Sequence, residues 1–319
     1  MPINLRFIGV DVAQKTLMVA EHGAASTVEI ANATRAITTW LRGLEGRCAI
    51  GMESTGSCHR LLAGLAHAAG HVVYVLNPRD IRHYGRALGR RAKTDRVDAL
   101  LIARYLSQEH DGLHPWEMPS RTQELLSSAL NRRRVLVTTR EQIRASFAGH
   151  EAELVELAPT LAQIGKLIAD LDVQMQEIVK ADEALAALKA RLQSVAGIGE
   201  IVSTALANLL LRYRFRNSDA LIAYIGLDPR ASDSGQHRGR RHLSKRGPAE
   251  LRRLIFNAAM SGAHTPAWVA YYEQLRNRGL KGTEAFIALA RKMLRTVFSM
   301  TRYGTNFDPQ RLRGACAKP

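Results

Sequence analysis

The spacing of apolar residues changes near His114, and this change divides the chain into regions of different architecture. Before His114, short apolar runs alternate with helix-like segments, whereas long helical patterns follow one another after it. Alternating strands and helices are typical of an α/β domain with a mainly parallel sheet. We therefore predict an α/β domain over residues 1–112, a helical arm over 113–190 and a mainly helical C-terminal domain over 191–319.

Strands are predicted where apolar, β-branched runs are short, and helices where apolar residues recur every three or four positions. The predicted strands are Leu5–Val10, Cys48–Met52 and Val72–Leu76, with Leu17–Ala20 as hairpin partner of the first. The predicted helices of the α/β domain are Thr34–Leu44, Leu61–Ala69 and a third one that Thr94 caps and that continues through Tyr105. The predicted C-terminal helices are Val202–Tyr213, Ser218–Ile225, Ala249–Ser261 and Gly282–Tyr303.

The arm contains a heptad seam, in which apolar residues alternate steps of four and three. The seam consists of Leu157, Leu161, Ile164, Ile168, Leu171, Met175 and Ile178. A similar but interrupted spacing precedes it at Leu125, Ala129, Leu136, Ile143, Phe147 and Leu154, with Arg132 and Thr139 between them. The two segments can pair as an antiparallel coiled coil within one chain or dimerise, because one seam satisfies either arrangement.

The charge of the chain favours association with a polyanion. The formal net charge is +16 and the isoelectric point is about 10.3, which is unusual for an enzyme of small molecules. No apolar stretch approaches the roughly 18 residues that a membrane-spanning helix needs. We therefore expect a cytoplasmic, nucleoid-associated protein that binds nucleic acid.

Four carboxylates are candidates for one metal site. Asp11 and Glu53 lie at the ends of predicted strands, and the ends of strands are where ligands bind in open α/β sheets. Asp95 and Asp98 are three residues apart at the start of the next helix, so they share a face. Each acid alone is more often a turn former or a helix-dipole partner. Together they favour Mg²⁺ or Mn²⁺, because all-oxygen ligation suits these ions and converging carboxylates need a cation.

Two further segments point to nucleic acid. Gly197 and Gly199 lie in a turn that is typical of a helix-hairpin-helix, whose free N–H groups bind a phosphate, although such a turn can also be a simple connector. A loop between Arg230 and Arg253 is rich in basic residues that are suited to phosphate, together with Lys93 near the carboxylates. The basic candidates in and beside this loop are Arg238, Arg240, Arg241, Lys245 and Arg246.

Short motifs in this order resemble the insertion-sequence transposases that carry a RuvC-like Asp-Glu-Asp-Asp domain, a family of bridge-RNA-guided recombinases. The matching N-terminal pieces are Ile8-Gly9-Val10-Asp11 with Lys15, Glu53-Ser54-Thr55-Gly56, Asn77-Pro78, Lys93-Thr94-Asp95 and Asp98-Ala99. The matching C-terminal pieces are Gly226-Leu227, Pro229-Arg230, Ser234-Gly235 and Arg238-Gly239. The resemblance extends from Phe7 to about Asp308, but Ala196 stands where the family usually has proline.

The resemblance implies a fold, a chemistry and partners. It implies an RNase H-like N-terminal domain in which Asp11, Glu53, Asp95 and Asp98 bind Mg²⁺. It also implies that Ser234 is a nucleophile that forms a phosphoserine with DNA, with Ser232 and Ser244 as competing positions. The implied enzyme is a homo-oligomer, a dimer or tetramer, that acts on donor and target DNA and is guided by a structured non-coding RNA.

Two other functions compete with this interpretation. In a four-carboxylate nuclease of the Holliday-junction resolvase type, water attacks the phosphate and Ser234 is an ordinary loop residue. In a non-enzymatic nucleic-acid binder, the arm and the basic loop bind without any metal. Substitution of Ser234 separates the first alternative from the recombinase, and substitution of Asp11 separates the second.

Overall fold

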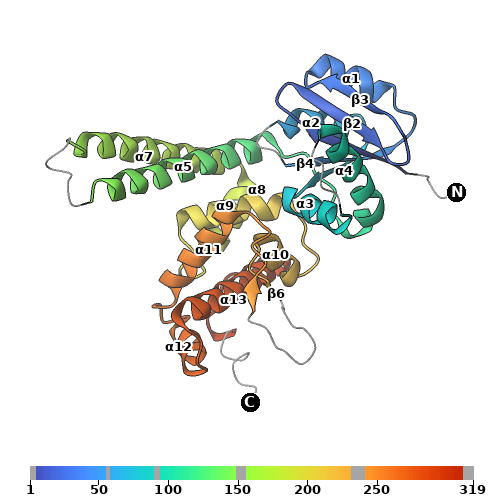
Figure 1. Ribbon diagram of the computed structural model, residues 1–319. Coiled ribbons are helices and arrows are strands. Elements are labelled where there is room, and N and C mark those ends of the chain that lie inside the picture. The colour runs from blue at the N-terminus through green and yellow to red at the C-terminus, as the bar shows by residue number, and fades with distance from the viewer. Residues whose placement is uncertain (1–4, 55–57, 90–93, 149–155, 231–240, 312–319) are drawn as a thin grey trace. The chain divides into compact units, whose positions relative to one another are not determined.

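The computed structural model describes residues 5–54, 58–89, 94–148, 156–230 and 241–311 (Figure 1). The chain forms two compact units, residues 1–118 and 119–319, and each has its own hydrophobic core. The helices of the predicted arm belong to the second unit, because they pack into its core. No helix in the described ranges is long and apolar enough to cross a membrane.

The first unit is a mixed five-stranded sheet with helices on both faces. The strands are β1 (Arg6–Val12), β2 (Thr16–Glu21), β3 (Thr27–Ala31), β4 (Cys48–Glu53) and β5 (Val72–Leu76), in the order β3-β2-β1-β4-β5. The helices are α1 (Thr34–Arg42), α2 (His59–Ala68), α3 (Pro78–Ala87) and α4 (Asp95–Glu109). β2 is antiparallel to β1 and β3, whereas β4 is parallel to β1 and to β5.

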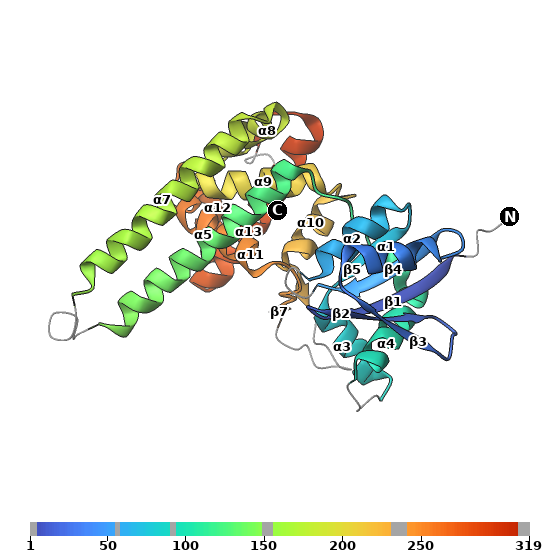
Figure 2. The ribbon, with the colours of Figure 1, turned by 90° about the horizontal axis from the view of Figure 1, so that it is seen from above.

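The two faces of the sheet bury different helices because successive strand residues point to opposite sides. In β1, Ile8, Val10 and Val12 join the core cluster that contains residues of α1 and α2. The other face of the sheet packs against α3 and α4, whose residues Ile81 and Ile102 join a second cluster. Figure 2 shows these two helical layers above and below the sheet.

Gly9 allows α4 to lie directly on β1. A Cβ atom at Gly9 would be 2.2 Å from the backbone nitrogen of Ala103 and 2.3 Å from the carbonyl oxygen of Ala99. Neither backbone atom can move without displacing the helix. We therefore expect Gly9→Ala to lower the free energy of unfolding of this unit by about 2 kcal/mol or more.

Urea unfolding, with hydrogen exchange of the β1 and α4 amides as the local measurement, checks this expectation. Gly112→Ala is the matched control, because a Cβ atom there has no neighbour within 4 Å. The control should change stability by less than about 0.5 kcal/mol. Equal effects of the two substitutions would contradict the close approach at Gly9.

The second unit consists mainly of helices. They are α5 (Arg121–Ser146), α7 (Ala158–Lys180), α8 (Glu183–Gln193), α9 (Glu200–Arg212), α10 (Ser218–Ile225), α11 (Ala249–Gly262), α12 (Val269–Asn277) and α13 (Gly282–Tyr303). A two-stranded ribbon joins β6 (Pro229–Arg230) to β7 (His242–Leu243). The core of this unit includes the fully buried side chains of Trp268, Leu206 and Leu289. The four helices predicted in this region are present, with small shifts of their ends.

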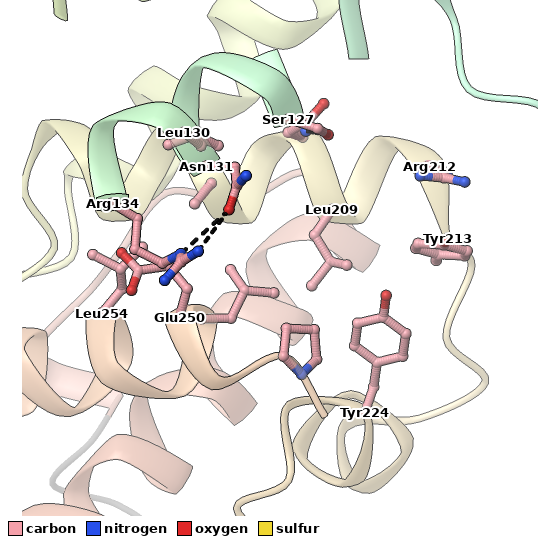
Figure 3. Close-up of a pocket in the computed structure, with 14 residues that line it drawn as sticks. Ser127, Leu130, Asn131, Arg134, Leu209, Arg212, Tyr213, Tyr224, Glu250 and Leu254 are labelled. Carbon is pink, nitrogen blue, oxygen red and sulfur yellow. Dashed lines mark hydrogen bonds between the residues drawn. The ribbon is translucent and has the colours of Figure 1, made fainter. Parts of the chain in front are cut away.

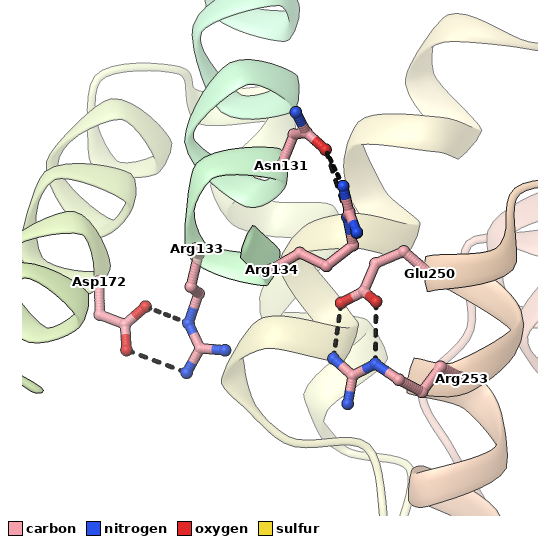
Figure 4. Close-up of polar contacts among 6 residues, drawn as sticks. All are labelled: Asn131, Arg133, Arg134, Asp172, Glu250 and Arg253. Carbon is pink, nitrogen blue, oxygen red and sulfur yellow. Dashed lines mark hydrogen bonds and ion pairs between the residues drawn. The ribbon is translucent and has the colours of Figure 1, made fainter. Parts of the chain in front are cut away.

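α5 and α7 pair with each other in an antiparallel hairpin within the chain, as Figures 1 and 2 both show. Leu126 near the start of α5 shares a core cluster with Val179 near the end of α7. Further along the hairpin, Arg133 forms a bidentate ion pair with Asp172, at N–O distances of 2.6 and 3.2 Å (Figure 4). Of the predicted α7 seam, Ile168 and Met175 are buried and the other residues are partly buried, while a coiled coil stays a prediction.

Three positions of the predicted α5 seam are wrong, because Arg132 and Thr139 are exposed as well as Leu125, and predicted Leu154 lies outside the described residues. Leu125 is 47% exposed, and its neighbour Leu126 is buried in its place. From Leu126 the seam continues through Ala129 to Arg133, whose charge Asp172 neutralises. An apolar pattern alone misplaces this register because a paired arginine occupies an inward position.

Candidate carboxylate site and serine loop

Asp11 and Glu53 lie side by side at one edge of the sheet. In the parallel pair β1 and β4, Val10 lies opposite Met52, and Asp11 and Glu53 are the next residues in each strand. Because side chains alternate, Asp11 is on the same face as Gly9, which α4 covers. Both acids are partly buried. The predicted meeting of these two strand ends is thus present in the backbone.

The first turn of α4 is at the same edge. At the opposite end of the helix, the rings of His110 and Phe7 lie 4.7 Å apart, and Ala103 lies over Gly9. α4 therefore runs antiparallel to β1, and its N-terminus points towards the strand end that carries Asp11. Asp98 in the first turn is partly buried, and Asp95 is exposed.

Thr94 fixes the start of this helix as predicted. Its hydroxyl oxygen accepts a hydrogen bond from the backbone N–H of Val97 at 3.3 Å. The side chain of Arg96 points away from the helix and donates to the carbonyl oxygen of Ala25 at 3.0 Å. The cap and this anchor hold the two aspartates in the first helical turn. Lys93, the predicted phosphate ligand beside them, lies outside the described residues.

The donor set fits a hard divalent cation in its chemistry. All four groups are carboxylates, and they come from two adjacent strand ends and one helix start on one face of the sheet. Within the described ranges, no three side chains of His, Cys, Asp or Glu form a group that could already hold a metal ion. The backbone thus brings the four acids to one edge of the sheet, but their side chains are not grouped closely enough to coordinate one ion.

The predicted serine loop begins and ends at the ribbon of β6 and β7. Pro229 pairs with Leu243, and Arg230 pairs with His242. Ser234, Ser232, Arg238 and Arg240 lie between these strands, outside the described residues. Arg241, Lys245 and Arg246 are described and exposed, which suits the predicted contact with phosphate.

Ser244 is a structural residue at the root of this loop. It is 8% exposed, and its hydroxyl group donates a hydrogen bond to the carboxylate of Asp228. Its backbone N–H donates to the carbonyl oxygen of Asp228 at 2.9 Å, and the next N–H, of Lys245, donates to Gly226 at 3.1 Å. A hydroxyl group that is buried in this way is out of reach of a DNA backbone, which leaves Ser234 and Ser232 as candidate nucleophiles.

We expect Ser244→Ala to loosen the loop root without removing the chemistry. The substitution deprives the partly buried Asp228 carboxylate of a donor, which costs at most about 1–3 kcal/mol. Hydrogen exchange of residues 226–230 and 242–246 should accelerate, while covalent adducts with DNA still form. Loss of the adduct without faster exchange would instead assign the nucleophile to Ser244.

The turn at Gly197 is packed against α11. Gly197 has a φ of +91°, and a Cβ atom there would be 2.5 Å from the carbonyl oxygen of Ala258. The carbonyl oxygen of Ala196 accepts a hydrogen bond of 2.9 Å from the indole nitrogen of buried Trp268. Gly199 is the N-cap of α9 and has open space around its Cβ position. Packing accounts for Gly197, and phosphate binding by Gly197 and Gly199 stays a prediction.

Sequence reasoning missed a pocket of about 250 Å³ in the second unit. Asn208, Tyr213 and Tyr224 are among its lining residues. One signal was available in the sequence, since residues 212–216 alternate arginine with aromatic residues. Such interleaving is a mark of nucleic-acid binding, because the rings stack on bases and the guanidinium groups contact phosphates.

Comparison with known proteins agrees with a carboxylate domain joined to a DNA-recombining domain. A family model of the DEDD type of IS110, described as "Transposase", matches residues 8–150. A second, described as "Transposase IS116/IS110/IS902 family", matches residues 189–273. These two matches indicate a transposase of the DEDD class. The chain belongs to the IS110/IS116 transposase family.

Several relatives resemble the chain over most of their length. The "Pilin gene-inverting protein" of Moraxella bovis is 26% identical over 95% of this chain and 97% of its own. A "Probable family 20 transposase" of Pseudomonas aeruginosa is also 26% identical, over 96% of this chain and its full length. The DEDD match suggests a RuvC-like RNase H fold for the first unit, and the mixed five-stranded sheet agrees with it. This match also suggests dependence on a divalent metal.

Proposed function

We propose that this transposase is an RNA-guided DNA recombinase that cuts and rejoins strands through a phosphoserine at Ser234. The observation that carries the proposal is the joint position of Asp11, Glu53 and the first turn of α4 at one edge of the sheet. The resemblance of the serine loop to that of bridge-RNA-guided recombinases supports the second half of the reaction. Membership of a transposase family supports DNA as the substrate.

In the proposed reaction, the four carboxylates form a negative corner that receives a divalent cation. Asp11 and Glu53 are the donors from the strands, and Asp95 and Asp98 are the donors from the helix. Bound Mg²⁺ would polarise a phosphate oxygen and so favour attack on phosphorus, as Mn²⁺ would. Thr94 contributes by holding both aspartates at the helix start.

In the covalent step, the hydroxyl oxygen of Ser234 forms a bond to a DNA phosphorus atom. The bond from that phosphorus to one deoxyribose oxygen breaks, and this oxygen leaves as a hydroxyl group. The serine gives up one proton and the leaving oxygen gains one, so the exchange is balanced. The phosphodiester energy is kept in the phosphoserine, and the reverse attack by a deoxyribose hydroxyl rejoins a strand without ATP.

Basic residues are proposed to hold the nucleic acids by their backbones. Arg241, Lys245 and Arg246 are exposed around the loop root, and Arg238 and Arg240 precede them in sequence. Guanidinium groups bind phosphate oxygens in a bidentate manner and do not read base sequence. We assign sequence choice to a structured non-coding RNA and the complete active site to a homo-oligomer, because the resemblance implies both.

Trapping the protein on DNA tests the proposal. Purified protein, the transcript that flanks its gene, Mg²⁺ and end-labelled DNA should yield a protein–DNA species that survives denaturing electrophoresis. The adduct should be absent with EDTA. A nuclease of the resolvase type would cut the DNA without an adduct, and a simple binder would do neither, so each alternative has its own outcome.

The resolvase-type nuclease remains the second candidate because the same carboxylate corner would support it. In that reaction a water molecule replaces the serine hydroxyl as nucleophile. A nuclease of this type would cleave DNA without any contribution from the serine loop. Substitution of Ser234 therefore separates the two reactions.

A further inference from the structure

The pocket in the second unit lies where four helices meet, and all of its walls belong to that unit. α5 supplies Asn131 and Arg134, and α9 supplies Asn208, while α10 and the start of α11 complete the walls. Figure 3 shows Tyr213 and Tyr224 at one end of the pocket and Arg134 with Glu250 at the other. Its volume of about 250 Å³ is below the roughly 300–1,000 Å³ of sites for drug-sized ligands, so it suits one small ring system.

One end of the pocket is aromatic. The rings of Tyr213 and Tyr224 lie 5.4 Å apart, and Phe215 completes a cluster of three rings, at 5.4 Å from Tyr224 and 6.5 Å from Tyr213. The guanidinium carbon of Arg212 lies 4.9 Å from the centre of the Tyr213 ring. Burial, followed by the neighbouring Tyr213, raises the pKa of the Tyr224 hydroxyl, so the Tyr224 ring stays neutral. Planar, neutral surfaces of this kind stack on planar heteroaromatic rings.

The pocket also has a polar edge with an unused acceptor. Asn208 is 8% exposed, and its amide nitrogen donates to the hydroxyl oxygen of Ser127 at 3.0 Å. Its amide oxygen finds no donor within the described part of the chain. A buried acceptor that lacks a donor costs free energy, which a ligand with an N–H group would recover. The exocyclic amino group of a nucleobase is such a donor.

The rim is positive. Both carboxylate oxygens of Glu250 are engaged by Arg253, at 2.6 and 2.8 Å, so this acid does not cancel the nearby charge (Figure 4). Asn131 accepts from the Arg134 side chain at 3.0 and 3.3 Å and holds its guanidinium group at the pocket. Tyr213 has an extended backbone, and after it Arg214 and Arg216 are exposed while Phe215 between them is partly buried.

We propose that this pocket binds one unstacked nucleobase of a single-stranded nucleic acid, which stacks on Tyr213 and hydrogen-bonds to Asn208. Arg214 and Arg216 contact the flanking phosphates. The inference rests on the proposed function only in taking nucleic acid as the substrate. A guide RNA and a DNA strand separated during recombination could each supply such a base, and the pocket would bind the base in the same way from either source.

Two changes test the pocket together: removal of one base from the nucleic acid, and removal of the Tyr213 ring from the protein. The full chain is titrated in EDTA with labelled single strands about 12 nucleotides long, a length typical of single-strand sites. One set is RNA and one is DNA of the same sequence, and each set moves one abasic nucleotide along the strand. We expect one abasic position to weaken binding to the unsubstituted protein by about tenfold.

Tyr213→Leu should bind the intact strand about tenfold more weakly than the unsubstituted protein does. The abasic position should then weaken the binding of this variant no further. Tyr303→Leu is the matched control, because Tyr303 is 71% exposed and lies at the end of α13. The control should keep the full response, and circular dichroism should show that both variants are folded. A response in the RNA set assigns the base to the guide, and one in the DNA set assigns it to a DNA strand.

The proposal is overturned if no position responds in either set, or if Tyr213→Leu keeps the response. Because EDTA prevents strand cleavage, these outcomes are independent of Ser234 and the carboxylates. A failure here therefore leaves the phosphoserine reaction standing. If the trapping experiment fails but the abasic position still weakens binding, the phosphoserine reaction is contradicted and the proposal for the pocket stands.

Discussion

Ser234→Ala should abolish both the covalent protein–DNA adduct and strand transfer, with a loss of about 1,000-fold or more. Alanine removes the hydroxyl oxygen that forms the proposed bond to phosphorus, and attack by water instead would leave no adduct. The measurement is denaturing electrophoresis of labelled DNA after incubation with protein, flanking transcript and Mg²⁺. Binding of the variant to the same DNA should be unchanged, because the hydroxyl group contributes little to phosphate contacts.

Ser232→Ala is the control for this experiment, since it removes a hydroxyl group two residues away in the same loop. It should form the adduct at the normal rate. Continued cutting by Ser234→Ala, without an adduct, would identify a resolvase-type nuclease. Loss of the adduct in Ser232→Ala alone would move the nucleophile to that position.

Asp11→Asn should lower strand cleavage by about 1,000-fold, because stabilisation of phosphoryl transfer by a divalent ion is worth several kcal/mol. The amide has nearly the same size as the carboxylate but does not supply its charge to a cation. The position is partly buried beside Glu53, at the end of a strand that makes a full set of sheet pairs. We therefore expect the variant to fold and to lose its response to added Mg²⁺ or Mn²⁺.

Glu29→Gln, in the exposed edge strand β3 of the same unit, is the matched exchange of an acid for an amide. It should keep its activity and its response to metal. Isothermal titration with Mn²⁺ provides a readout apart from cleavage, and heat should be seen for Glu29→Gln and not for Asp11→Asn. Strand cleavage by Asp11→Asn equal to that of the unsubstituted protein would contradict the role of Asp11 in the chemistry. A protein that binds DNA but neither cleaves it nor responds to metal, with or without the substitution, would be a non-enzymatic binder.

Much of the first unit follows from the sequence because its strands are buried, apolar and short. The prediction missed β3, whose residues are mostly exposed and which therefore lacks an apolar pattern. It also missed α3, although Asn77 accepts from the N–H of Arg79 at 3.0 Å and Pro78 occupies the first turn. These two residues follow the end of β5 and begin a helix directly, and the sequence pattern predicts only the end of the strand.

The candidate sites differ in how far local sequence predicts them. Asp11 and Glu53 could be paired from strand alternation alone, since parallel strands bring their ends to one edge. The direction of α4 depends on a close contact between Gly9 and Ala103, which no local pattern reveals. The pocket is harder still to predict, because Asn131, Asn208 and Tyr224 come from three different helices. Only the alternation of arginine and aromatic residues after Leu211 indicates it locally.

α5 belongs at once to the hairpin and to the pocket, and this gives the helix a mechanical property. Its 26 residues form a rod of about 39 Å, whose first turns are anchored in the core of the second unit. Arg133 forms an ion pair with Asp172 of α7, while the adjacent Arg134 lines the pocket. Because Arg133 and Arg134 are neighbours on one continuous helix, a rotation of α5 about its axis would move the contact with α7 and the wall of the pocket together.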